Sequence, residues 1–126
     1  PGVRVMGAEP RGADDAARGK ASGARVEEQT PATIADGLKT TLGDLTWPVV
    51  RDLVEDIFVV DDLLIITAMK LVFERMKLVV EPSGAVPLAA VLSQRFLALE
   101  GCKRVGVVFS GGNVDLDELP WVRMRR

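Results

Sequence analysis

The sequence predicts an α/β protein whose strands run parallel. Short apolar segments at residues 3–8, 56–60 and 104–109 have the composition of buried strands. Two long apolar segments of helical character separate the second of these from the third. Strands that alternate with helices are typical of a parallel sheet covered by helices. The chain has 126 residues, 48% of them hydrophobic, which suffices for the core of one domain.

The first strand opens the chain at residues 3–8. We expect it to end before Pro10, because proline has no N–H to donate to a strand ladder. Residues 10–31 are polar, charged and rich in glycine. They predict a loop that contains a single helical turn after Asp14.

A short helix and the second strand follow a turn-rich stretch at residues 33–48. The helix is expected at residues 48–55, because proline suits the first turn of a helix. Residues 56–60, "DIFVV", form the strand. Asp61 then has the side chain of a good N-cap for the next helix.

Two apolar helices come next. The first, at residues 62–77, is apolar on most sides, which predicts a helix buried between layers, with Met69 and Met76 in the core. The second lies within residues 81–101, follows a proline- and glycine-containing turn, and should stop at Gly101.

Composition excludes several classes of function. The 16 basic and 18 acidic residues nearly balance and form no basic stripe, so we expect no nucleic-acid partner. Charged residues interrupt the most apolar region, so no membrane span is expected. The absence of histidine removes histidine-dependent triads and the usual zinc sites. Cys102 is the one cysteine, which excludes an internal disulfide and favours a reducing, cytoplasmic location.

Residues that could contact a ligand follow the first and the last predicted strand. Glu9 follows the first, and the glycine turn at residues 110–113 follows the last. In open α/β sheets, ligands gather at the carboxyl ends of strands. Gly111 and Gly112 leave the backbone bare, which permits close approach of another group. Taken alone, the turn is more simply explained as a plain connection from strand to loop.

Four segments resemble one family. "AEPRGADD", "TIADGLKTTLGDLTWPVVRDLVEDIF", "ERMKLVVEPSGAVPLAAVLSQRF" and "FSGGNVDL" are similar to the C-terminal part of serine racemases. These are fold type II pyridoxal-phosphate enzymes, related to the serine and threonine dehydratases. The resemblance implies that residues 1–126 form the C-terminal portion of a tryptophan synthase beta-like catalytic domain. They would belong to its large domain, a parallel sheet flanked by helices, with the N-terminal half absent from this chain.

The resemblance implies a cofactor site at the glycine turn. Ser110 would face the pyridine nitrogen of pyridoxal 5'-phosphate, and Gly111 and Gly112 would let the backbone approach the ring. A neutral hydroxyl cannot hold that nitrogen protonated as an aspartate would, which suits racemisation and β-elimination. Glu81 would lie near the cofactor. Its sequence context also fits an ordinary acid at a turn or helix start.

A divalent-cation site is also implied by the resemblance. The side chains of Glu9 and Asp15 and the carbonyl of Ala13 would bind Mg²⁺ or Ca²⁺, both of which prefer oxygen ligands. Spacing alone favours a solvated acidic loop.

Two further residues match an ATP site. Lys77 and Asn113 correspond to positions that contact ATP, an allosteric activator, in animal serine racemases. From the sequence alone, a surface lysine at a helix end explains Lys77 more simply.

The resemblance also implies which parts of the catalyst this chain does not supply. The family needs a Schiff-base lysine, a serine on the opposite face of the cofactor and a glycine-rich phosphate loop. None of the five lysines has the required context, so no catalytic residue is assigned and the chain alone is expected to be inactive. The lysines are Lys20, Lys39, Lys70, Lys77 and Lys103.

Three interpretations of function remain open. The first is a serine racemase with serine dehydratase activity, homodimeric at full length, that acts on L-serine, D-serine and, as a third candidate, L-threonine. The second is a catabolic threonine/serine dehydratase. The third is a non-catalytic remnant or dimerisation module.

Overall fold

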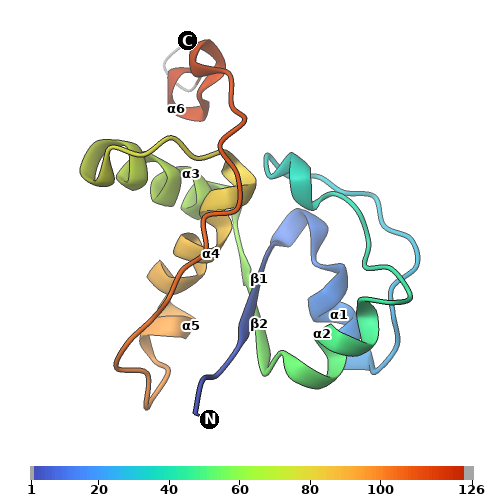
Figure 1. The fold of residues 1–126 in the computed structure, drawn as a ribbon. Helices are drawn as coiled ribbons and strands as arrows, with labels where there is room; N and C mark the ends of the chain where they lie inside the picture. Colours follow the sequence, from blue (N-terminus) through green and yellow to red (C-terminus); the bar gives the residue numbers. More distant parts are fainter. Residues whose placement is uncertain (1, 124–126) are drawn as a thin grey trace.

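A computed structural model describes residues 2–123 and confirms the α/β class (Figure 1). Its elements in chain order are β1 (Met6–Pro10), η1 (Arg11–Ala13), α1 (Asp15–Ser22), η2 (Asp36–Leu38), α2 (Trp47–Leu53), β2 (Asp56–Val60), α3 (Asp62–Leu71), η3 (Val72–Met76), α4 (Pro82–Leu92), α5 (Gln94–Leu97), η4 (Leu116–Glu118) and α6 (Pro120–Arg123). The second strand has the predicted bounds, and the first is shifted toward Pro10.

In the described residues, β1 and β2 form one parallel pair. Met6 lies opposite Asp56 at one end, and Pro10 lies opposite Val60 at the other. Pro10 is the last residue of its strand, where a missing N–H removes little from the ladder. Because parallel strands need a crossover connection, α1 and α2 lie in the long segment that joins them.

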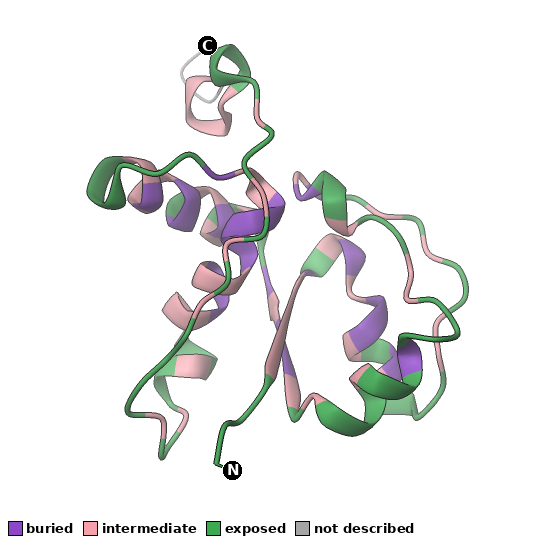
Figure 2. Cartoon of the chain, in the orientation of Figure 1, coloured by how far each residue is buried: buried purple, intermediate pink, exposed green. Residues whose placement is uncertain are grey.

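Helices cover both faces of the strand pair (Figure 1). On one face α4 packs on both strands and α3 packs along α4, while on the other face α1 packs on β2 and contacts α2. The core lies mainly between the strands and the α3–α4 pair, as the purple segments of Figure 2 show. The fully buried or nearly fully buried core residues there include Phe58, Val60, Ile65, Ala68, Met69, Val72, Ala85, Val86 and Ala89.

The region after β1 differs from the prediction, because α1 is an eight-residue helix rather than a single turn. It buries one small-residue face, and a β-carbon on Gly19 would lie 3.0 Å from the ring of buried Trp47. Gly23 ends the helix in a left-handed conformation, with φ at 78°. Contacts with a distant tryptophan stabilise a helix whose own sequence has little apolar periodicity.

The predicted 62–77 helix is divided, and it is buried on one face only. The α-helix ends at Leu71 and continues as the π-helical η3. Met69 is fully buried, as predicted, but Met76 is 51% exposed and Leu63 is 67% exposed. Within the described chain α3 packs mainly on α4, so its opposite face has no cover. None of the described helices combines the length and apolar character needed to cross a bilayer.

The predicted second apolar helix is also divided. Pro82 stands in the first turn of α4, so the expected turn before the helix is absent. Ser93 breaks the helix, and its hydroxyl accepts a hydrogen bond from the N–H of Phe96 to start α5. Gly101, with φ at 80°, lies in a turn beyond α5 rather than directly at a helix end.

The predicted strand at residues 104–109 is wrong. The segment runs beside α5 and α4 without regular structure (Figure 1). A strand requires a neighbour for its backbone hydrogen bonds, and no described strand pairs with this segment. An open groove of about 640 Å³ lies between it and β1. Val105 and Val108 are 47% and 74% exposed as a result.

Candidate functional site

The glycine turn at residues 110–113 rests against the start of α4. The backbone N–H of Glu81 donates to the carbonyl of Gly111 over 3.1 Å. In the opposite direction, the backbone N–H of Asn113 donates to Oε2 of Glu81 over 2.9 Å. Glu81 therefore donates one hydrogen bond to the turn and accepts another from it.

Three glycines make this contact possible. A β-carbon on Gly111 would lie 2.5 Å from Oε1 of Glu81, and one on Gly84 would lie 2.7 Å from the carbonyl oxygen of Gly111. A β-carbon on Gly112 would lie 2.9 Å from the carbonyl oxygen of Val79. The sequence predicted that the bare backbone would admit close approach, and within this chain the approaching group is the first turn of α4 and the residues before it.

Ser110 is the first residue of this anchored turn and is exposed. Its hydroxyl has no hydrogen-bond partner among the residues that the structure describes. The groove beside β1 ends at Val108 and does not include Ser110. The hydroxyl is therefore accessible, with donor and acceptor capacity available to a ligand.

A second segment, around η2, reaches the start of α4. The N–H of Gly37 donates to the hydroxyl oxygen of buried Ser83 over 3.0 Å. The carboxylate of Asp62 holds the same segment, because it accepts from the hydroxyl of Thr33 over 2.6 Å and from the N–H of Ile34 over 3.0 Å. The sequence predicted this segment only as part of the turn-rich stretch at residues 33–48. It carried no signal for Ser83.

Glu9 lies at the carboxyl end of β1 and at the N-terminus of α1. Its two carboxylate oxygens accept the backbone N–H groups of Ala16 and Ala17 over 3.1 and 2.9 Å. Burial is the largest influence on this carboxyl and raises its pKa, while the two N–H groups oppose the rise. The negative charge of nearby Asp15 raises the pKa of Glu9 further.

Asp15 faces the interior, with only 4% of its surface exposed. Its carboxylate accepts from Nε2 of Gln29 over 3.1 Å and from the N–H of Leu42 over 2.9 Å. Asp14, by contrast, pairs with Arg18 over 2.7 Å on the surface. A solvated acidic loop therefore describes Asp14 but not Asp15.

The chemistry of these donors fits a hard divalent cation. Each carboxylate oxygen of Glu9 and Asp15 carries one hydrogen bond and keeps a further lone pair. The carbonyl of Ala13 completes the predicted set of ligands. Ala13 lies between Glu9 and Asp15 in the sequence, and its side chain is buried. No three acidic, histidine or cysteine side chains converge within residues 2–123, so a cation here would take waters as its remaining ligands.

Lys77 has a left-handed backbone, with φ at 60°, and is the one described non-glycine residue with a positive φ. Its exposed Nζ donates to the carbonyl of Glu74 over 2.6 Å. This contact fits the simpler interpretation, a lysine at the end of a helix. The backbone N–H of exposed Asn113 is engaged by Glu81, and its side chain has no hydrogen-bond partner among the described residues.

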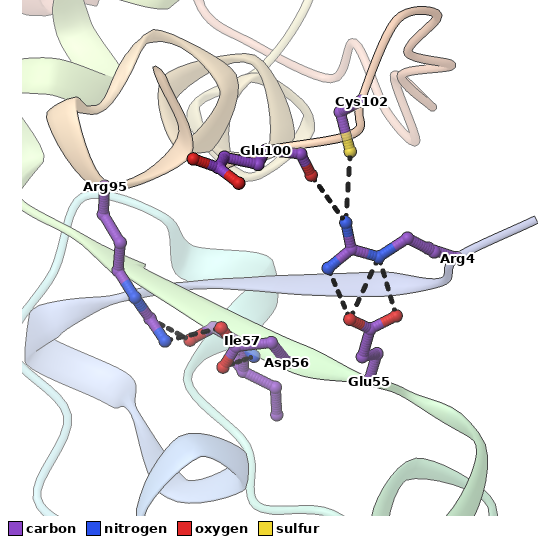
Figure 3. Close-up of polar contacts among 7 residues, drawn as sticks. All are labelled: Arg4, Glu55, Asp56, Ile57, Arg95, Glu100 and Cys102. Atoms are coloured by element: carbon purple, nitrogen blue, oxygen red, sulfur yellow. Dashed lines mark hydrogen bonds and ion pairs between the residues drawn. The ribbon is translucent and has the colours of Figure 1, made fainter. Parts of the chain in front are cut away.

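A separate group of polar contacts lies at the amino ends of β1 and β2 (Figure 3). The guanidinium of Arg4 binds the carboxylate of Glu55 and reaches the carbonyl of Glu100 over 3.2 Å and Sγ of Cys102 over 3.7 Å. Cys102 is half-buried.

Arg95 completes this second cluster (Figure 3). Its Nη1 donates to the carbonyl of Ile57 over 2.9 Å, and its Nη2 pairs with Asp56. The guanidinium also stacks over the ring of Phe58 at 4.8 Å. These contacts join the starts of β1 and β2 to α5 and to the turn after it. We interpret them as contacts that stabilise the fold.

Known proteins resemble the chain along almost all of its length. Residues 1–111 match the family described as pyridoxal-phosphate dependent enzyme. A serine racemase of Oryza sativa subsp. indica is 54% identical over 94% of this chain and 36% of its own length. A beta-hydroxyaspartate dehydratase of Paracoccus denitrificans is 49% identical over 96% of this chain and 38% of its own.

Solved structures agree with the sequence relatives. A structure of maize serine racemase superposes with a TM-score of 0.90 at 52% identity and covers 99% of this chain and 39% of its own. The chain thus spans between a third and two-fifths of the length of these relatives. By its sequence and its fold, this chain belongs to the fold type II pyridoxal-phosphate-dependent enzymes.

Proposed function

We propose that this chain is part of a pyridoxal-phosphate-dependent serine racemase that also has serine dehydratase activity. The observation that carries the proposal is the exposed Ser110 hydroxyl on a turn anchored to α4. Its support is the 54% identity with a serine racemase of rice and the 52% identity with that of maize.

The residues at the turn fit the pyridine end of the cofactor. Ser110 would hydrogen-bond the ring nitrogen, and the bare backbone of Gly111 and Gly112 would lie close to the ring, with Glu81 behind them. When bound, pyridoxal phosphate supplies an electron sink that stabilises negative charge at the α-carbon of an amino acid. A neutral serine hydroxyl at the nitrogen would keep that sink weaker than a carboxylate would.

We further propose that Glu9, Asp15 and the carbonyl of Ala13 bind Mg²⁺ or Ca²⁺ in the full-length gene product. The buried carboxylate of Asp15 and the raised pKa of Glu9 describe two acids whose charges a cation would stabilise. ATP binding at Lys77 and Asn113 and a homodimeric assembly are proposed by resemblance to serine racemases.

A dehydratase is the second candidate function. The 49% identity with a dehydratase that acts on beta-hydroxyaspartate favours it. In this case the main product from L-serine would be pyruvate, and L-threonine would give 2-oxobutyrate. A non-catalytic remnant is the third candidate, and it would bind no cofactor.

The test uses the full-length gene product incubated with pyridoxal phosphate. A racemase gives a visible absorption band of bound cofactor and forms D-serine from L-serine, with pyruvate as a second product. Pyruvate and 2-oxobutyrate without D-serine would favour the dehydratase. A protein without the visible band would contradict both enzymatic proposals.

A further inference from the structure

We infer that Glu81 is a positioning residue, whose carboxylate holds the 110–113 turn so that the Ser110 hydroxyl keeps one direction. The inference rests on the proposed function, because it assigns that hydroxyl to the cofactor. It gives Glu81 a role through the turn, in addition to its proximity to the ring.

The turn depends on Glu81 more than on any other residue. Residues 104–113 have no strand partner among the described residues. Within residues 2–123, both hydrogen bonds that join this segment to the rest of the fold involve Glu81. One uses its backbone N–H and the carbonyl of Gly111, and the other uses its carboxylate and the N–H of Asn113.

A carboxylate suits this position for two physical reasons. Glu81 immediately precedes α4, an eleven-residue helix whose N-terminal end favours negative charge. A hydrogen bond from a backbone N–H to an ionised carboxylate is shorter and stronger than one to a neutral acceptor. Within residues 2–123, the carboxylate makes no hydrogen bond to its own helix, and its one hydrogen bond is the bond from the Asn113 N–H.

Close packing limits how far the turn can move. A β-carbon on Gly84 would lie 2.7 Å from the carbonyl oxygen of Gly111, and one on Gly111 would lie 2.5 Å from Oε1 of Glu81. In the same helical turn, the hydroxyl of Ser83 accepts the N–H of Gly37, and a β-carbon on Gly37 would lie 3.7 Å from Oε1 of Glu81. The η2 segment thus holds the start of α4 in place. Glu81, at that start, in turn holds the 110–113 turn.

The experiment compares three variants of the full-length gene product loaded with pyridoxal phosphate. Glu81→Ala removes the acceptor, Glu81→Gln keeps an oxygen acceptor without the charge, and Glu74→Ala removes an exposed glutamate that pairs with Lys70. Amide hydrogen exchange of residues 110–114 reports the hold on the turn. The visible absorption and circular dichroism of bound cofactor report the position of Ser110.

We expect Glu81→Ala to speed exchange of the Asn113 amide about tenfold, the loss of one hydrogen bond, and to change the cofactor spectrum. Glu81→Gln should restore most of both signals, and Glu74→Ala should match wild type. If Glu81→Ala does not fold, Glu81→Asp replaces it, because its shorter carboxylate retracts from the Asn113 N–H while the backbone bond to Gly111 remains.

Two outcomes would overturn the inference. Unchanged exchange in Glu81→Ala would show that the carboxylate does not hold the turn. Faster exchange with an unchanged cofactor spectrum would show a structural role that does not extend to Ser110. Failure of the wild-type protein to bind pyridoxal phosphate would instead contradict the proposed function, and the exchange measurement on the cofactor-free protein distinguishes the two cases.

Discussion

Gly12 and Ala32 lie in direct backbone contact, although α1 and the first part of a long loop separate them. The N–H of Ala32 donates to the carbonyl of Gly12 over 2.8 Å. A β-carbon on Gly12 would lie 1.8 Å from the carbonyl oxygen of Ala32. The loop that follows α1 thus returns to η1 and leaves no space there for a methyl group.

Gly12→Ala should therefore destabilise the protein, by about 3 kcal/mol, because two backbone segments must separate to admit the methyl group. The free energy of unfolding, measured by urea denaturation of the full-length gene product, checks this. Gly106→Ala is the matched control, because a β-carbon on Gly106 would meet nothing within 4 Å. Equal urea midpoints for the two variants would contradict the packing described for Gly12.

Asp15 provides a test of the proposed cation site. Asp15→Ala leaves the N–H of Leu42 and the amide of Gln29 without their acceptor, which should cost about 2 kcal/mol. It should also abolish the rise in melting temperature that we expect from added Mg²⁺. Thermal unfolding of the full-length gene product with Mg²⁺ and with a chelator measures both effects.

Asp14→Ala is the control for this measurement, because Asp14 makes only a surface ion pair with Arg18. It should lose little stability and keep the response to Mg²⁺. A response to Mg²⁺ that survives in Asp15→Ala would exclude Asp15 as a ligand.

Features that depend on local pattern were predictable from the sequence. The strand at residues 56–60 has the expected bounds, because a bounded run of apolar and β-branched residues is itself the signal. The turn at residues 110–113 was predictable as a place of close approach, because glycines admit it.

Features that depend on distant contacts were not predictable. The length of α1 depends on the Glu9 carboxylate at its start and on Trp47 across Gly19. Residues 104–109 have the composition of a strand, but composition cannot supply the neighbouring strand that pairing requires. The contact of Glu81 with the glycine turn joins segments 30 residues apart, and no sequence periodicity reports it.

Replacing Lys77 or Lys70 by glycine should change the free energy of unfolding in opposite directions. Its left-handed backbone costs an L-residue about 1 kcal/mol, whereas glycine adopts it freely, so Lys77→Gly should raise the free energy of unfolding by about 0.5 kcal/mol. Lys70→Gly, inside α3, should lower it by about 1 kcal/mol. Urea denaturation of both variants checks the signs.

The same pair of variants tests the proposed ATP site. Lys77→Gly should weaken ATP binding, measured by calorimetry on the full-length gene product, while Lys70→Gly should leave it unchanged. Equal ATP affinity in the two variants would contradict an ATP contact at Lys77. Lys77 would then be only a lysine at the end of a helix.

Arg4 and Glu55 give the prediction for pH. The hydrogen bond from the Arg4 guanidinium lowers the pKa of Glu55, with a further contribution from the attraction between the two charges. A carboxyl whose pKa is lowered on folding stabilises the folded state above its unfolded pKa, and this stabilisation is lost as the pH falls through the folded value. The contribution should be small, because both side chains are substantially exposed.

Carbon-13 NMR titration of labelled glutamate in the full-length gene product measures this pKa directly. Glu55 should titrate below the ordinary value of about 4.3, and Arg4→Ala should return it to that value. Arg51→Ala, which removes the partner of Asp52 instead, should leave the titration of Glu55 unchanged. If Glu55 titrates at its ordinary pKa in the wild-type protein, then the Arg4 contact does not persist in solution, and the start of β1 is held to β2 by the strand ladder and by the 2.8 Å bond from the Glu55 N–H to the Val5 carbonyl.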